Sequence, residues 1–321
     1  MTTGTPHSVS RSVLLFGATG TIGRAVLAEL LAQGHDVTVV GRTPVEGAWF
    51  IAADVTKIDD LNQYIPVRPY DAVISCLASR TGAPSDAWAI DHDAHQGILT
   101  FAKARGIGQF VLLSAICVQR PKLAFQKAKL AFEARLKESG LRYSIVRPTA
   151  YFKSLSGQVA RVRAGKPFLV FGDGKLTACK PISDRNLAAY MVRCLWDGGL
   201  QNQVLPIGGP GPAITPLDQV AMLEEVLGEP VQVRRVPVAM MSAIIGLLRL
   251  AGLVSGRARD KAELARIGRY YATESMLVYD AKAGRYDADA TPETGSDTLQ
   301  RHYADLVAGR TTVDLGEHAM F

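Results

Sequence analysis

Residues 13–34 read VLLFGATGTIGRAVLAELLAQG, and this stretch decides the fold. A short apolar run leads into Gly17, Gly20 and Gly23, and an amphipathic helical pattern follows and ends at Gly34. Backbone N–H groups at the start of such a helix, together with the helix dipole, attract a pyrophosphate. The glycine spacing alone is weak evidence, but its place between a strand and a helix predicts a dinucleotide site.

The same alternation of strand and helix patterns continues to about residue 150. Short β-branched runs alternate with longer helical patterns, and Gly34, Gly106 and Gly140 are placed to end helices in the left-handed conformation. Near-continuous apolar strands separated by helices indicate a parallel sheet covered on both faces. We therefore expect an α/β protein with a doubly wound parallel Rossmann sheet in residues 1–150. The expected strands are 13–16, 37–40, 49–51, 72–75, 110–114 and 143–146.

After Pro148 the pattern changes. A helix is expected from about residue 154 to 164, and FLVFGDG predicts a strand that runs into a turn. Ser183 is placed to cap one further helix, and Pro216 to open another through Leu227. Because no Pro/Gly/Ser-rich linker intervenes, residues 151–321 are expected to form a smaller C-terminal substrate lobe packed on the sheet, not an independent domain.

Composition favours a small acidic ligand over nucleic acid. The net charge is +6, but lysine and arginine are spread along the chain and do not interleave with aromatic residues. The four cysteines form no C-x-x-C pair and no metal-ligand spacing with the histidines, so reduced thiols, an intracellular location and no metal are expected. The N-terminus lacks the apolar run of a signal peptide.

An apolar segment at residues 236–254 allows two interpretations. Its run VPVAMMSAIIGLL is shorter than the ~18 residues of a membrane-spanning helix. A buried helix is the favoured expectation. A surface that contacts a membrane or an amphipathic ligand is the alternative.

The end of the second strand favours NADPH over NADH. An NAD-binding protein usually carries an acid there, whereas this chain reads VVGRT. Arg42 is expected to pair with the 2′-phosphate, with help from Arg24, or else to be a solvated loop residue. Asp54 follows the third strand, where it could accept from the adenine amino group or cap the next helix.

Two long segments carry a resemblance. Residues 147–191 (RPTAYFKSLSGQVARVRAGKPFLVFGDGKLTACKPISDRNLAAYM) and 271–299 (YATESMLVYDAKAGRYDADATPETGSDTL), with the glycine loop, resemble the atypical short-chain dehydrogenase/reductases. Within that superfamily the chain resembles the NADPH-dependent 3,8-divinyl (proto)chlorophyllide a 8-vinyl reductases over residues 12–308. The resemblance implies hydride transfer from NADPH to a tetrapyrrole 8-vinyl group. The plant transit peptide is missing, which implies a bacterial, cytoplasmic protein, at most peripheral to photosynthetic membranes.

The stretch LAFQKAKLAFE at residues 123–133 departs from the superfamily pattern. Carbonyl-reducing relatives keep a Tyr-x-x-x-Lys pair there, whereas this chain has Phe125 and Lys129. The tyrosine protonates an alkoxide, and a vinyl group forms none, so the loss is understandable. Lys129 is expected to hold ribose hydroxyls, with an exposed helix lysine as the alternative, and Ser114 to line the cofactor cleft.

The resemblance also implies where the ligands bind. Tyr151 and Lys153 lie beyond the sixth strand, where each could donate the proton, as could water, or could only shape the pocket. Phe125 is placed at the pigment, Phe152 is expected to stack on it or to lie in the core, and Lys180 to bind its propionate. The expected cofactor residues are Gly17, Thr19, Gly20, Thr21, Ile22, Gly23, Arg24, Arg42, Asp54, Val55, Cys76, Leu77, Ala78, Ser114, Lys129, Pro148 and Thr149.

Other functions stay open on the sequence. His92 and His95 could bind the pigment's magnesium, but their spacing favours surface or packing roles. Phe125 taken alone favours an NADP-binding redox sensor or structural subunit without turnover. A C=C reductase for a phenolic or isoprenoid substrate would keep the fold and cofactor and change only the pocket.

Overall fold

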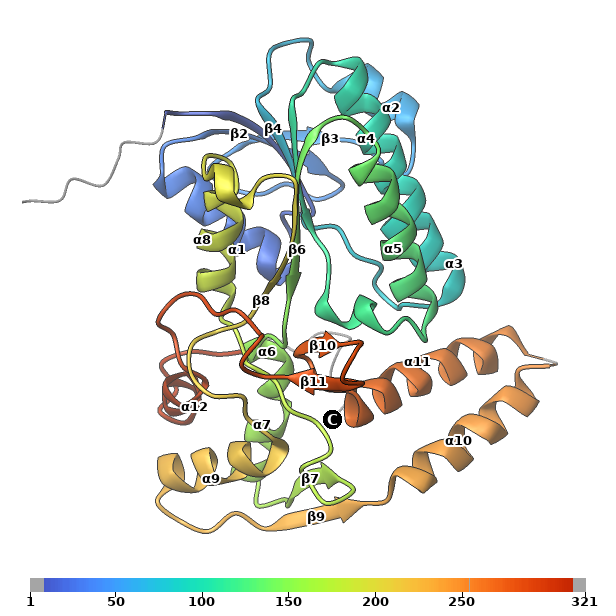
Figure 1. The fold of residues 1–321 in the computed structure, drawn as a ribbon, viewed down its shortest axis with the longest axis vertical. Coiled ribbons are helices and arrows are strands. Elements are labelled where there is room, and N and C mark those ends of the chain that lie inside the picture. Colours follow the sequence, from blue (N-terminus) through green and yellow to red (C-terminus); the bar gives the residue numbers. More distant parts are fainter. Residues whose placement is uncertain (1–8, 254, 314–321) are drawn as a thin grey trace, which may run out of the picture.

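The computed structural model describes residues 9–253 and 255–313. In this part of the chain the centre is a parallel sheet of seven strands in the order β3-β2-β1-β4-β5-β6-β8 (Figure 1). The order runs outward in both directions from β1, so the predicted doubly wound sheet is confirmed. Its strands are β1 (Ser12–Phe16), β2 (Asp36–Gly41), β3 (Trp49–Ala52), β4 (Ala72–Ser75), β5 (Gln109–Leu113), β6 (Arg142–Pro148) and β8 (Gln203–Ile207).

Helices cover both faces of the sheet because the strand side chains alternate between two apolar layers. Val13 and Leu15 of β1 pack in one layer and Leu14 and Phe16 in the other, and all four are fully buried. The first layer lies under α1 (Thr21–Ala32) and α8 (Asp184–Arg193), and the second under α2 (Ile58–Tyr64), α4 (His95–Ala104) and α5 (Ala124–Lys137) (Figure 1).

The expected boundary at residue 150 does not separate the two lobes. Strand β8 pairs with β6, and Leu187 and Met191 of α8 pack in the same layer as β1. The segment from α8 to β8 therefore belongs to the Rossmann part. Strand β8 was not predicted from the sequence because it contains Pro206, which is unusual in a strand. It is an edge strand, and an edge strand can hold a proline because its outer side forms no ladder hydrogen bonds.

The remaining elements form the smaller lobe. Ser183 caps α8 by accepting from Asn186 N, and α9 begins at Pro216, both as predicted. The helix expected at 154–164 is interrupted at Ser156, whose hydroxyl donates to Phe152 O. The lobe contains α6 (Phe152–Leu155), α7 (Gly157–Arg163), β7 (Phe168–Phe171), α9 (Pro216–Leu227), β9 (Val233–Val236), β10 (Val278–Asp280), β11 (Arg285–Asp287) and α12 (Leu299–Val307).

Short elements link the layers. They are α3 (Pro84–Ala87), a π-helix (Trp88–Ala94) and two 3-10 helices (Ile116–Gln119 and Gly198–Leu200). The π-helix leads directly into α4 and packs against α5.

Helices α10 (Val238–Ala251) and α11 (Gly256–Thr273) form a hairpin that projects from the body of the molecule (Figure 1). The helix predicted in the apolar segment is present, but the expectation that it is buried was wrong. Ile245 is the one buried residue of α10. None of the helices in the described ranges is both long and apolar enough to span a bilayer.

Candidate active site

The expected site residues gather at one edge of the sheet. Because all seven strands of the described sheet are parallel, their carboxyl ends meet there, and the crevice at the strand-order reversal lies between β1 and β4. The glycine loop follows β1, and Cys76 follows β4. Arg42, Ser114 and Thr149 follow β2, β5 and β6.

The glycine loop is packed so tightly that two of its glycines admit no side chain. Gly17 has a φ of +78°, and a Cβ there would lie 2.6 Å from the carbonyl carbon of Cys76. A Cβ on Gly23 would lie 2.0 Å from Gly17 O. Gly20 is different, since its Cβ would make only an ordinary contact, 3.5 Å from Gly17 O. Internal packing therefore does not require glycine at position 20.

The N-terminus of α1 fits an anion. Its N-cap is Gly20, no side chain caps it, and its first turn carries no acid, so its first N–H groups keep their hydrogen-bonding capacity. Lys153 Nζ donates to Thr21 Oγ1 at 3.0 Å, which brings one cation to this end of the helix. Arg24 Nε donates to Thr19 O at 2.9 Å. These residues fit the pyrophosphate of a dinucleotide.

The side chains of some expected cofactor residues pack or hydrogen-bond within the protein. Ile22 and Cys76 pack in the apolar layer under α1, and Val55 packs against the layer on the other face. The hydroxyl of Thr149 donates to Lys180 O. Leu77 N lies 2.7 Å from where a Gly17 Cβ would stand, so this turn lies against the glycine loop.

Arg42 and Asp54 lie at the ends of neighbouring strands. Arg42 is exposed, as a residue that meets a 2′-phosphate must be before the ligand binds. Asp54 accepts from Thr56 N and Oγ1 at 3.1 and 2.7 Å, while α2 begins only at Ile58, so Asp54 caps a turn and not the helix. The bond from Thr56, with smaller effects of Lys57 and Arg42, holds the pKa of Asp54 below its usual value.

Lys129 is buried and paired with an aspartate that the sequence analysis missed. Its Nζ lies 2.9 Å from Asp91 Oδ1, and the Asp91 side chain is fully buried in the π-helix. Asp91 also accepts from Ser79 N and Oγ, in the turn after β4. The alternative of an exposed helix lysine is therefore wrong. Asp91 stands about one turn before α4 begins at His95, and nothing in the local sequence indicated that it would be buried.

Ser114 and Phe125 are not where the resemblance implied. Ser114 is buried, and its hydroxyl donates to Glu133 Oε1 at 2.6 Å, where Arg147 is also paired. Its side chain thus faces a buried ion pair and not the cleft. Phe125 is buried in the apolar cluster that includes Ile267 of α11, so it serves as packing.

Tyr151 lies at a meeting point of the two lobes. It is half-buried, precedes α6 and forms a β-bridge with Ile182. Burial raises the pKa of its phenol well above the usual value, and Cys76 and Cys117 act in the same direction. Phe152 is buried against the His302 ring, at 5.3 Å between centroids, so it belongs to the core and the stacking role is not supported.

Tyr271 of α11 was not identified from the sequence. Its hydroxyl lies 3.9 Å from Cys117 Sγ, although 40% of the residue is exposed. Burial of the phenol raises the pKa of Tyr271 well above its usual value, with contributions from Cys117 and Tyr151. The side chain thus joins the hairpin to the carboxyl edge of the sheet. Its only sequence signal was its place at the start of the segment 271–299.

Lys180 and the two histidines are engaged elsewhere. Lys180 Nζ donates to Thr291 O at 3.2 Å and lies 3.6 Å from Glu293 Oε2, so it is not a free cation for a propionate. His95 is buried between Ser75 Oγ and Ile90 O, and burial above all lowers its pKa to about 4. His92 contacts Asp93. The predicted packing role of His95 is confirmed.

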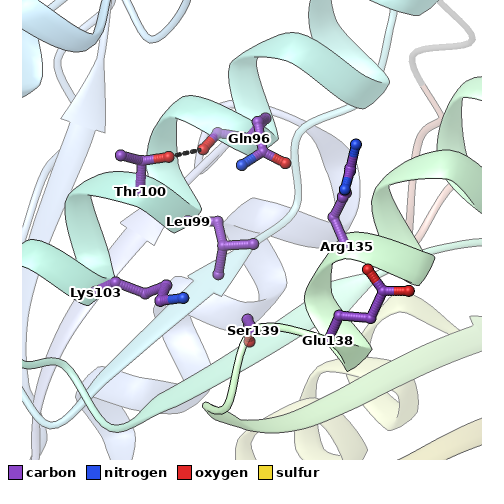
Figure 2. Close-up of a pocket in the computed structure, with 7 residues that line it drawn as sticks. All are labelled: Gln96, Leu99, Thr100, Lys103, Arg135, Glu138 and Ser139. Carbon is purple, nitrogen blue, oxygen red and sulfur yellow. Dashed lines mark hydrogen bonds between the residues drawn. The ribbon is translucent and has the colours of Figure 1, made fainter.

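A hollow of about 360 Å³ lies away from this edge, between α4 and α5 (Figure 2). None of the expected site residues lines it. Its floor is Leu99, and its rim is polar and charged, with Thr100 Oγ1 donating to Gln96 O. Its residues are Gln96, Leu99, Thr100, Lys103, Arg135, Glu138 and Ser139.

Comparisons with known proteins agree with an NAD(P)H-binding fold. A family model described as NAD(P)H-binding matches residues 17–197. The chain is 44% identical to the divinyl chlorophyllide a 8-vinyl-reductase of Cucumis sativus, over 97% of this chain and 80% of that protein. For the Zea mays protein of the same name the identity is 45%, over 97% and 83%. An NADPH-bound quinone oxidoreductase of Escherichia coli shares the fold, with a TM-score of 0.64 at 19% identity over 92% of this chain and 99% of that one.

Proposed function

The chain belongs to the divinyl chlorophyllide a 8-vinyl reductases, and on that premise we propose that it reduces the 8-vinyl group of 3,8-divinyl chlorophyllide a to an ethyl group. The reaction consumes one NADPH and one proton: a hydride adds to the terminal vinyl carbon, a proton adds to its neighbour, and NADP⁺ is released. The observation that carries the proposal is the 44% identity over nearly the whole chain.

The chain's own residues bind and orient the cofactor. When bound, NADPH supplies the hydride. The N–H groups at the start of α1 would hold the pyrophosphate, with Lys153 beside them, and Arg42 would pair with the 2′-phosphate. Lys129, held by Asp91, would bind the ribose next to the nicotinamide. Asp91 also accepts two hydrogen bonds from Ser79, and this buried carboxylate in turn holds the Lys129 ammonium in one position.

The proton comes from a different group than in carbonyl-reducing relatives. Hydride on the vinyl terminus leaves negative charge spread over the macrocycle, so no donor is needed at position 125. We assign the proton to Tyr151, because it follows β6 at the carboxyl edge of the sheet and its side chain is only half-buried. Its raised pKa means that the phenol carries its proton at neutral pH, as a donor must. Lys153 and water were the other candidates, and the contact of Lys153 with Thr21 favours a role at the cofactor for this lysine.

We propose a tetrapyrrole as the substrate beside NADPH, and a cytoplasmic location peripheral to photosynthetic membranes. A free chlorophyllide is a flat apolar ring with a carboxylate, and such molecules partition to membrane surfaces.

The decisive test is anaerobic incubation of the purified protein with NADPH and 3,8-divinyl chlorophyllide a, followed by chromatography and mass spectrometry. A pigment heavier by two hydrogens, absent without NADPH, is expected. NADPH that binds but is not consumed would favour the sensor or structural-subunit hypothesis. Consumption only with a phenolic or isoprenoid alkene would favour a related C=C reductase.

Arg42→Ala is expected to weaken NADPH binding by about 10- to 100-fold and to change NADH binding by less than about twofold, because only NADPH carries the 2′-phosphate. Fluorescence titration of the two cofactors measures both. Lys57→Ala, an exposed cation near Asp54, serves as the matched control and should affect both cofactors little. Equal losses for NADPH and NADH would remove Arg42 from the 2′-phosphate site.

A further inference from the structure

The hairpin of α10 and α11 carries an exposed apolar face. Met240, Ile244, Leu247 and Leu250 follow one another at helical spacing, and Leu253 lies in the turn beyond. Leu247, Leu250 and Leu253 are 68%, 67% and 79% exposed. On the opposite side, Ile245 is buried where α10 packs against α11. The exposed face therefore serves no packing purpose within the described chain.

The C-terminal half of this face borders a shallow hollow. This hollow of about 720 Å³ includes Leu247, Leu250 and Leu253 of the face, and its walls are apolar with one arginine at its border. Exposed apolar patches of this kind mark binding surfaces in soluble domains, since scattered single residues are normal but clusters are not. The residues that line it are Ala243, Gly246, Leu247, Arg249, Leu250 and Leu253.

The charge around the face favours an anionic occupant. Between Arg249 and Arg269 the sequence holds six arginine or lysine residues and two acidic residues. Arg249, Lys261 and Arg269 are exposed together with one acid, Asp260, whereas Glu263 is buried and paired with Arg266, so the exposed charge is mainly positive. A second copy of the chain would bring two positively charged hairpins together, which Coulomb repulsion opposes.

We propose that the α10–α11 hairpin docks on an anionic lipid surface, with the apolar face of α10 at the acyl boundary and the basic residues at the headgroups. An apolar stripe flanked by lysine and arginine is the pattern of helices that lie in the membrane interface. With 14 residues, α10 is about 21 Å long and too short to cross the ~30 Å hydrocarbon core.

The hairpin also connects this surface to the site. Tyr271, in the last turn of α11, reaches Cys117 at the carboxyl edge of the sheet, and α10 packs along α11. An amphiphilic pigment lying in the membrane surface would thus meet the protein beside the cleft. This second step rests on the proposed function, whereas lipid binding itself does not.

Co-sedimentation of the full chain with vesicles tests the proposal. The purified protein should bind vesicles of phosphatidylglycerol and phosphatidylcholine and should bind pure phosphatidylcholine about tenfold more weakly. Leu247→Glu/Leu250→Glu should lower binding to the anionic vesicles at least about tenfold, because two carboxylates would enter the apolar boundary. The matched control is Val9→Glu/Val67→Glu, which changes two exposed apolar residues outside the hairpin and should bind like the wild type.

Three outcomes would overturn the proposal, two of them in the vesicle assay. One is unchanged vesicle binding by the leucine variant; the other is no binding by the wild type. A wild-type dimer in light scattering that the leucine variant converts to a monomer would assign the face to a second copy instead. Reduction of pigment dispersed in detergent reports the proposed function separately, and the leucine variant should retain it.

Discussion

Gly20→Val is expected to weaken NADPH binding by about 100-fold while leaving the melting temperature nearly unchanged. Gly20 has φ −72° and ψ 165°, which valine adopts readily, and its Cβ would make only an ordinary contact at 3.5 Å. The backbone conformation and the space at Cβ are therefore both compatible with a side chain at position 20. What it obstructs is the close approach of the pyrophosphate to the backbone at the start of α1. Fluorescence titration with NADPH and a thermal melt measure the two effects.

Substitutions of two other glycines serve as comparisons for Gly20→Val. Gly23→Ala should lower the melting temperature as well, because its Cβ would lie 2.0 Å from Gly17 O. Gly34→Ala should leave NADPH binding intact and cost only about 1 kcal/mol, since its φ is +75° but nothing lies within 4 Å. If Gly20→Val binds NADPH normally, the phosphates do not approach position 20.

Lys129→Met is expected to lower kcat/KM by about 100-fold, through loss of the group that positions the nicotinamide ribose. The same variant should also be less stable by about 3–5 kcal/mol, because Asp91 would be left buried without its counter-ion. Activity loss and stability loss would then be confounded in the single variant.

The double variant Lys129→Met/Asp91→Asn separates them. Asparagine keeps a carbonyl oxygen for Ser79 and carries no charge, so most of the stability should return. Turnover should not return, and the KM for NADPH should stay raised. A double variant with wild-type kinetics would show that the Lys129–Asp91 pair only supports the structure. Steady-state kinetics and thermal melts of the wild type and both variants provide the comparison.

Much of the fold was predictable because it depends on local patterns. The glycine loop, the six strands from β1 to β6 and the starts of α8 and α9 each follow from a few neighbouring residues. Alternation of apolar side chains, a helix cap and a proline at the first helical position act over one or two turns. Strand β8 was missed because Pro206 is tolerable only at an edge, and a sequence does not show which strand is the edge.

The site was predictable only in part, because the sequence does not show which residues far apart in the chain come into contact. The sequence by itself determined which residues follow the strands, and parallel pairing places all of these at one edge. Only the tertiary structure decided which side chains remain available there: Ser114 turns to Glu133, Lys180 to Thr291 and Lys129 to Asp91.

Whether the α10–α11 hairpin is buried also depends on tertiary contacts. The apolar run of α10 is compatible with a core or with a surface. The hydrophobic effect favours removal of apolar side chains from water but does not specify what covers them. The chain offers α11 to one side of α10 and nothing described to the other. Local sequence thus determined the elements and their order, whereas contacts between residues far apart in sequence decided which charges are paired and which apolar face stays exposed.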